Sequence, residues 1–201
     1  MDRRERPTPR IRAGPAINRD REDTMPILVG HATAKGSTRG IAEHIATGLD
    51  RAGEVVDFRP LADVTSVREY ETLVVGSAIH NGQWLTEATA WVERLGPALT
   101  GRALWAYSVS SVGATSTILS PRLARYLRRV TPEPRAVQTL RSTADVRDHR
   151  SFAGAIAPGD WPGFGRIVFR VMGGRYGDAR DWNDIDNWVA AIRADVVRDR
   201  R

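Results

Sequence analysis

The stretch Ile27–Leu49, ILVGHATAKGSTRGIAEHIATGL, changes its apolar period halfway along. It begins with the apolar run Ile27–Val29 and ends with apolar residues at helical spacing. Between the two lie six small or polar residues, namely Thr33, Ala34, Lys35, Gly36, Ser37 and Thr38. The pattern predicts a buried strand, a short loop and an amphipathic helix that begins near Ser37.

This loop has the character of an anion site, because unpaired N–H groups and the helix dipole favour negative charge at a helix N-terminus. Thr33, Ser37 and Thr38 carry hydroxyl donors, and Gly36 would let the backbone approach a ligand closely. The spacing matches neither the G-x-x-x-x-G-K-S/T pattern nor G-x-G-x-x-G. A single phosphate fits best, because the loop is too short to wrap a diphosphate. The alternative is that Ser37 or Thr38 only caps the helix.

Strand and helix patterns alternate along the rest of the chain. Strands are expected at Pro26–His31, Glu54–Arg59, Thr72–Ser77, Ala103–Val109 and Arg150–Ile156. Helices are expected at Ser37–Ala52, Leu85–Leu95, Ser120–Val130, Arg166–Met172 and Trp182–Val197, with helix and strand both open for Arg135–Ser142. This alternation predicts an α/β fold, a doubly wound five-stranded parallel sheet with helices on both faces. Ligands of such sheets bind at the carboxyl ends of the strands, here the loops Ala32–Thr38, Ala78–Trp84 and Ser110–Thr117.

Composition indicates one domain over residues 25–201. The chain has 201 residues, 41% of them hydrophobic, and no cysteine. Residues 1–24 are rich in Arg, Pro and Asp and are expected to be disordered; an alternative is that translation begins at Met25. No apolar run is long enough for a membrane span, and the absence of cysteine fits the cytoplasm. The four histidines lack zinc-site spacing, so no metal is expected.

The formal net charge of +6 comes almost entirely from arginine, with Lys35 as the single lysine. The arginines are spread along every segment, which does not indicate a nucleic-acid site. Contact with an anionic substrate or, peripherally, with the inner face of the membrane stays open. The oligomeric state is not fixed by the sequence.

Three segments resemble known flavin-binding proteins. TAKGSTRGIAEHIATGL, from Thr33, resembles the phosphate loop of flavodoxin-like proteins, roughly S/T-x-T-G-x-T, with Lys35 where a threonine is usual. VVGSAIHNGQW, from Val74, looks like the second flavin loop of the flavodoxin-like, menaquinone-dependent protoporphyrinogen oxidases. GRYGDARDWNDIDNWVAAI, from Gly174, is similar to their C-terminal segment. The resemblance implies a flavodoxin-like fold with bound FMN.

The resemblance also implies where the flavin contacts the chain. The isoalloxazine ring would lie near Asn81 and Gly82, with Trp84 either stacked on it or closing the core. His80 would contact the flavin or its substrate, or would simply be solvated. With the phosphate loop and the small residues of the third loop, the candidate cofactor-binding residues are Thr33, Ala34, Lys35, Gly36, Ser37, Thr38, Ser77, Ala78, Ile79, His80, Asn81, Gly82, Trp84, Ser108, Ser110, Ser111 and Gly113.

Three functions are consistent with these observations. The first is an FMN oxidoreductase that passes electrons from a porphyrinogen or similar donor to a quinone. The second is a flavodoxin-type electron carrier, and the third is a cofactor-free binding module. No Ser-His-Asp set or carboxylate pair is apparent in the three loops, so no catalytic residue is assigned. The apolar residues of the segment 157–181 indicate either a helix on the sheet edge or a lid for a porphyrin, a quinone or a membrane.

Overall fold

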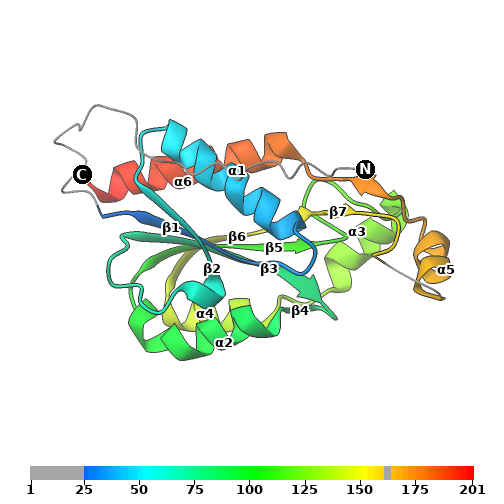
Figure 1. The fold of residues 1–201 in the computed structure, drawn as a ribbon, viewed down its shortest axis with the longest axis horizontal. Helices are drawn as coiled ribbons and strands as arrows, with labels where there is room; N and C mark the ends of the chain where they lie inside the picture. Colours follow the sequence, from blue (N-terminus) through cyan, green and yellow to red (C-terminus); the bar gives the residue numbers. More distant parts are fainter. Residues whose placement is uncertain (1–24, 161–163) are drawn as a thin grey trace, which may run out of the picture.

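A parallel sheet forms the centre of the molecule. The computed structural model describes residues 25–160 and 164–201, so the tail predicted at 1–24 lies outside the described residues. Five parallel strands follow the order β2-β1-β3-β5-β6 (Figure 1). They are β1 (Ile27–Ala32), β2 (Val56–Pro60), β3 (Thr72–His80), β5 (Ala103–Ser110) and β6 (Asp145–Ala153). This order confirms the predicted doubly wound α/β fold.

Helices cover both faces of the sheet. The helices α1 (Ser37–Arg51) and α6 (Trp182–Asp199) pack on one face, where Ile41, Ile45 and Trp188 belong to one buried cluster. The helices α2 (Thr86–Leu95) and α4 (Arg135–Thr143) cover the other face. Short 3-10 helices lie at η2 (Leu61–Asp63) and η3 (Gly96–Leu99). Because both faces are covered, β1 is buried at all six positions, as expected for a central parallel strand.

One close contact fixes β1 against its neighbours. Gly76 on β3 lies opposite Tyr107 on β5, and a Cβ at Gly76 would lie 2.4 Å from three carbons of the Tyr107 ring. The missing side chain therefore makes room for the ring. The buried Tyr107 hydroxyl donates to the carbonyl oxygen of Gly30 at 3.1 Å. Tyr107 thus ties β5 to β1 close to the loop that follows β1.

The last strand was predicted too late in the chain. It is expected at Arg150–Ile156, but β6 begins at Asp145 and is an edge strand with charged residues. These residues are held by α6: Trp188 Nε1 donates to Asp148 Oδ2 at 2.7 Å, and Arg147 Nη2 donates to Asp199 Oδ2 at 2.8 Å. A local hydrophobic pattern gives no information about partners this distant in sequence. The polar first half of the strand was therefore not predicted.

Three other elements differ from the prediction or complete it. The undecided segment Arg135–Ser142 is helical, as α4. The strand β4 (Gln83–Trp84) pairs antiparallel with the end of β3. A small second sheet pairs β7 (Ala155–Ile156) with β8 (Gly177–Asp178), so the last predicted strand residues leave the main sheet.

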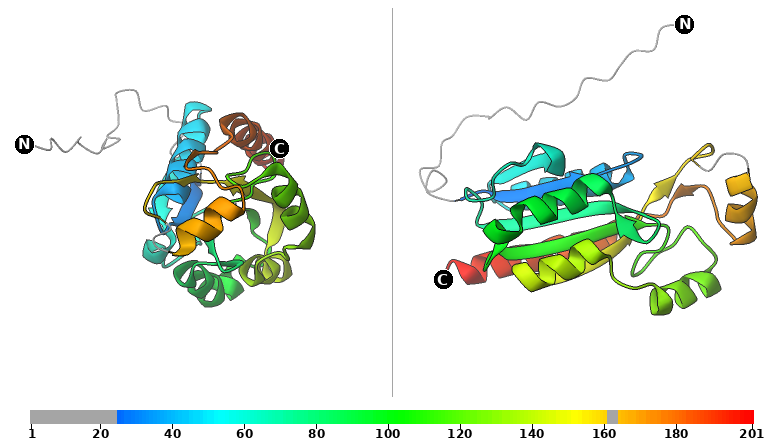
Figure 2. Two further views of the ribbon diagram at one scale, coloured as in Figure 1. Left: turned by 90° about the vertical axis from the view of Figure 1, so that its right-hand side faces the viewer. Right: turned by 90° about the horizontal axis from the view of Figure 1, so that it is seen from below.

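Two further helices project from one end of the molecule. They are α3 (Pro121–Val130) and α5 (Phe164–Val171), and α5 begins two residues before the helix predicted at 166–172. Both lie at the end where β1, β3 and β5 reach their carboxyl termini (Figures 1 and 2). A third cluster, built on buried Ile118, Leu119 and Phe169, attaches them there.

Candidate functional site

The loop after β1 opens on the start of α1. Gly36 precedes the helix with φ of 86°, a left-handed conformation that glycine adopts without strain. No side chain of the described residues caps this helix, and its first turn holds no acidic residue. Ser37 and Thr38 lie inside the first turn, so the alternative that one of them caps the helix is not what the structure has. In the described part of the chain, the first-turn N–H groups at the positive end of the helix dipole are therefore left without a side-chain cap.

The hydroxyls of Thr33 and Ser37 both accept hydrogen bonds from backbone N–H groups. Thr33 Oγ1 accepts from the backbone N–H of Gly36 at 3.0 Å, and Ser37 Oγ accepts from the N–H of Ala155 at 2.8 Å. A hydroxyl has one proton and two lone pairs, so each of these groups keeps its proton for another partner. In the described part of the chain neither hydroxyl donates to a protein group. The Gly36 N–H, in contrast, is already used.

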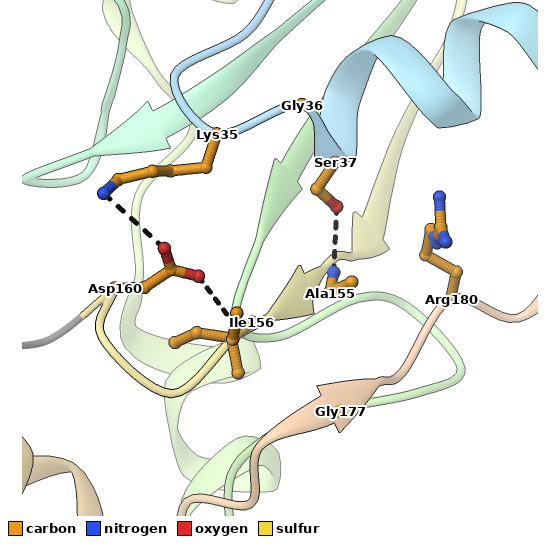
Figure 3. Close-up of a pocket in the computed structure, with 9 residues that line it drawn as sticks. Lys35, Gly36, Ser37, Ala155, Ile156, Asp160, Gly177 and Arg180 are labelled. Carbon is orange, nitrogen blue, oxygen red and sulfur yellow. Dashed lines mark hydrogen bonds and ion pairs between the residues drawn. The ribbon is translucent and has the colours of Figure 1, made fainter. Parts of the chain in front are cut away.

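A cavity of about 320 Å³ lies directly at this helix start. Figure 3 shows Ser37 pointing toward Ala155, with Lys35 and Arg180 on either side. The lining residues are Lys35, Gly36, Ser37, Ala155, Ile156, Ala157, Asp160, Gly177 and Arg180. The cavity thus joins the loop after β1 to the small β7–β8 sheet.

Charged side chains frame this cavity. Lys35 Nζ lies 3.5 Å from Asp160 Oδ1, and the second oxygen of Asp160 accepts from the N–H of Ala157 at 2.7 Å. Arg180 donates to Asp178 at 2.6 Å and lies 4.4 Å from the ring centroid of Trp182. The guanidinium lowers the pKa of the Asp178 carboxyl by hydrogen bonding. Two cations and one carboxylate, Asp160, therefore line the cavity, which suits an anionic ligand.

The predicted phosphate-loop residues do not all reach the cavity. Lys35, Gly36 and Ser37 line it, while Thr33 and Ala34 precede it on the same loop. Thr38 is 1% exposed and faces the core with the apolar stripe of α1. Thr38 therefore does not line the cavity, and its role as a phosphate donor stays a prediction.

The second predicted loop is a tight hairpin. Asn81 and Gly82 have φ of 50° and 75°, the left-handed conformations that a two-residue hairpin requires. His80 and Asn81 are exposed at the carboxyl edge of the sheet, and Ala78 and Ile79 are half-buried beside them. The Asn-Gly pair is a strong hairpin signal in any sequence, so this turn was open to prediction and was missed.

Trp84 lies in the core, the second of the two roles considered for it. Its side chain is 3% exposed, and its Nε1–H donates to Ser108 Oγ at 2.8 Å. A ring buried in this way does not stack on a ligand at the surface. Ser77 is fully buried as well, where it donates to the Ala78 carbonyl and accepts from the Leu85 N–H. The side chains of Trp84, Ser77 and Ser108 therefore hold the hairpin in place and do not line a surface site.

A buried chain of hydrogen bonds continues from Trp84. Ser108 Oγ lies 2.9 Å from His149 Nε2, and His149 Nδ1 lies 3.1 Å from Glu133 Oε1. Burial lowers the pKa of His149 against the opposing effect of Glu133, so the neutral ring accepts from Ser108 and donates to Glu133. The structure thus assembles a Ser-His-carboxylate set that was not apparent from the sequence. Ser108 is only 3% exposed, so the set supports β4 and offers no nucleophile to solvent.

The third predicted loop is closed by its own hydrogen bonds. Ser110 Oγ donates to the carbonyl of Val112 at 2.9 Å and accepts from its N–H at 3.1 Å. Gly113 packs so tightly that a Cβ would lie 2.3 Å from the backbone nitrogen of Ala153. Ser111 is half-buried on this loop. Contacts from this loop to a ligand would therefore come mainly from backbone groups and from Ser111.

Hydrogen bonds join the third loop to the cavity. The N–H of Gly154 donates to the Ser110 carbonyl at 2.9 Å, and the N–H of the following residue donates to Ser37. Ala179 on the far side of the β7–β8 sheet donates to the Gly154 carbonyl at 3.2 Å. The sequence did not assign the cavity residues Ala155, Asp160 and Arg180, because their contacts to the first loop span more than a hundred positions of the chain.

Comparisons with known proteins agree with this arrangement. The family model described as flavodoxin domain matches residues 28–172. No curated protein sequence matches the chain. Among solved structures, oxidised flavodoxin 2 from Bacillus cereus is 16% identical, with 85% of this chain and 99% of that one covered and a TM-score of 0.53. A mutant flavodoxin from Pseudomonas aeruginosa is 13% identical, with 84% and 99% covered and a TM-score of 0.50. These identities speak for the fold alone, whereas the family match covers most of the chain, which therefore belongs to the flavodoxin domain family.

Proposed function

We propose that the chain binds one FMN non-covalently and works as an FMN-dependent oxidoreductase. The observation that carries this proposal is the cavity at the start of α1. There the Ser37 hydroxyl keeps its proton free, and in the described part of the chain no side chain caps the first turn of the helix. The Thr33 hydroxyl, which precedes the cavity on the same loop, keeps its proton as well. Both features suit the phosphate group, whose oxygens accept hydrogen bonds and carry the negative charge that a helix N-terminus favours.

The residues around the cavity fit a phosphate of this kind. Lys35 and Arg180 supply positive charge. Gly36 is left-handed, and among the described residues no atom beyond its chain neighbours lies within 4 Å of the place a Cβ would take. That open space lets the backbone approach the ligand. The cavity of about 320 Å³ would hold the phosphate group of FMN. The flavin ring would be contacted by the hairpin at His80–Gly82 and by the loop around Ser111.

The electron-transfer chemistry would come from the cofactor, and the role of the chain is to position that cofactor. Bound FMN supplies one- and two-electron transfer. The hairpin is anchored to the sheet by the hydrogen bond from Trp84 to Ser108. This bond and the pairing of β3 with β4 fix the position of His80 and Asn81. His80 is exposed and titratable, and it belongs to the hairpin that would contact the flavin ring. We therefore expect its side chain to hydrogen-bond a redox substrate there.

The finer assignment is oxidation of a porphyrinogen with a quinone as electron acceptor. It is supported by the resemblance of Val74–Trp84 and Gly174–Ile192 to the menaquinone-dependent protoporphyrinogen oxidases. Exposed apolar residues on α5, at the same end of the molecule as the three loops, offer contact area for an apolar substrate. The matching family model equally suits a flavodoxin-type electron carrier, which is the second candidate.

One experiment separates these candidates. The FMN-loaded protein is mixed with protoporphyrinogen and a menaquinone analogue under nitrogen, and porphyrin fluorescence is followed with time. An oxidoreductase of this type produces porphyrin in repeated turnovers and only with the quinone present. A carrier produces none, yet accepts electrons from a flavodoxin reductase. A chain that takes up no FMN at all fits neither, and would indicate a cofactor-free binding module.

A further inference from the structure

The helix α5 presents apolar side chains to solvent. Ile167, Val168 and Val171 are 59%, 37% and 82% exposed, whereas Phe169 between them is fully buried. Phe169 anchors the helix through the cluster it shares with Ile118 and Leu119. The helix is thus held on one side and apolar on the other, where a surface helix of a globular protein normally carries polar residues.

The helix α3 shows a related pattern at the same end of the molecule. Its Leu123 and Leu127 pack on the cluster that holds Phe169. On its outer side, Tyr126 is 61% and Val130 is 51% exposed. Figure 2 shows both helices projecting from this end, so the exposed apolar residues stand at two separated points.

These two helices carry only positive charge. Neither 121–130 nor 164–171 contains an aspartate or glutamate. Exposed arginines surround the apolar residues, namely Arg122, Arg125, Arg129, Arg170 and Arg175. In the described ranges none of these five forms an ion pair, whereas arginines such as Arg150 and Arg200 elsewhere in the chain are paired with carboxylates.

We propose that α3 and α5 together form a docking surface for an anionic phospholipid bilayer. Apolar side chains flanked by arginines are the composition of helices that lie in a membrane interface. Two separated projecting points fit a flat, fluid surface better than a small ligand. A second copy of the chain would bring the unpaired arginines of two molecules together, which like-charge repulsion disfavours. Within residues 25–160 and 164–201, the structure has no helix with the length and composition of a membrane span.

Docking of α3 and α5 on a bilayer does not require bound flavin. The docking surface lies at the end of the sheet where the three loops open, next to the proposed flavin site. Docking would turn the hairpin at His80–Gly82 and the cavity at Ser37 toward the membrane side. An apolar electron acceptor dissolved in the bilayer would then be within reach of the site.

The test is co-sedimentation of the full chain with vesicles. One set contains phosphatidylcholine alone, and the other contains phosphatidylcholine and phosphatidylglycerol at a ratio of about 7:3. We expect binding to the anionic vesicles to be about ten-fold tighter or more, and to weaken as salt is raised. Equal binding to both sets, or binding to neither, would overturn the proposal.

Two variants locate the contact. Ile167→Ser with Val171→Ser, and separately Arg122→Gln with Arg125→Gln and Arg129→Gln, should each weaken anionic-vesicle binding about ten-fold. The matched control removes three exposed arginines elsewhere, by glutamine substitution at Arg51, Arg68 and Arg193. It should weaken binding by less than about three-fold, since these positions lie far from the proposed surface.

Circular dichroism and the melting temperature check that the variants fold, as exposed positions should allow. An equal loss of binding in the control would show that total charge, and not this surface, attracts the vesicles. Gel filtration of the free protein covers the remaining alternative. A dimer that the Ile167→Ser, Val171→Ser variant converts to a monomer would assign the surface to a second copy and overturn the lipid proposal.

Discussion

The substitution Ser37→Ala tests the proposed phosphate site at a single atom. Ser37 Oγ accepts from the N–H of Ala155 at 2.8 Å, and its proton is left for a ligand. Alanine removes the oxygen and leaves the first turn of α1 in place, because alanine is a good helix former. The variant therefore loses one donor to the phosphate and one acceptor for the β7 backbone.

The two losses have different sizes and different readouts. A hydrogen bond to a charged group contributes about 1.5–3 kcal/mol, so the Kd for FMN should rise about 10- to 150-fold. Ala155 is only half-buried, so its N–H can turn to water, and the free energy of unfolding should fall by about 1 kcal/mol. Ser37→Thr keeps a hydroxyl at the same position and should recover most of the FMN affinity.

The assay is quenching of flavin fluorescence on titration with flavin-free protein. Riboflavin, which lacks the phosphate, serves as the matched ligand, and its Kd should change less than about two-fold in Ser37→Ala. If FMN and riboflavin weaken equally, Ser37 acts through the β7 backbone and not on the phosphate. An unchanged Kd for FMN would place the phosphate somewhere else.

Three further predictions concern the surroundings of the site. Burial lowers the pKa of His149, so its neutral form stabilises the fold; the free energy of unfolding should fall as the pH drops below about 6.5, and His149→Gln should flatten this fall in urea titrations at pH 7 and 5. Gly76→Ala would place a Cβ 2.4 Å from the Tyr107 ring and should destabilise the fold by about 3 kcal/mol. The Cβ of Gly96→Ala would meet no described atom within 4 Å beyond its own local backbone, so this change should alter stability by less than about 1 kcal/mol. Asp160→Asn removes the carboxylate from the cavity and keeps an acceptor for the Ala157 N–H, so FMN should bind about two- to five-fold tighter with riboflavin unaffected; weaker FMN binding would contradict the assigned cavity.

Much of the fold could be predicted because its central strands and helices have clear local patterns of apolar residues. The runs at Ile27–Val29 and Thr72–Ser77 are buried on both faces, and the stripe of α1 recurs at helical spacing. The edge strand β6 lacks such a pattern in its first half. Its residues Asp148 and Arg147 are stabilised by α6, some forty to fifty positions later in the chain.

The candidate site could be predicted only on the side of the first loop. Lys35, Gly36 and Ser37 were found because a strand-to-helix loop with hydroxyls has a recognisable composition. The opposite wall, with Ala155 and Arg180, arises from tertiary packing that places the β7–β8 sheet over the loop. The local pattern also did not predict the burial of Thr38 and Ser108, which were listed among the candidate cofactor-binding residues. For Trp84 both roles were considered, and the structure has the one in the core.

The central claim is that this chain is an FMN protein, and the most direct measurement is the identity and amount of its cofactor. The purified protein is supplied with excess FMN, FAD and riboflavin together, freed of unbound ligand, and heated, and the released flavin is separated by chromatography. We expect one FMN per chain, with Ser37→Ala retaining markedly less. Release of FAD, or of no flavin from a protein shown to be folded, would contradict the proposal.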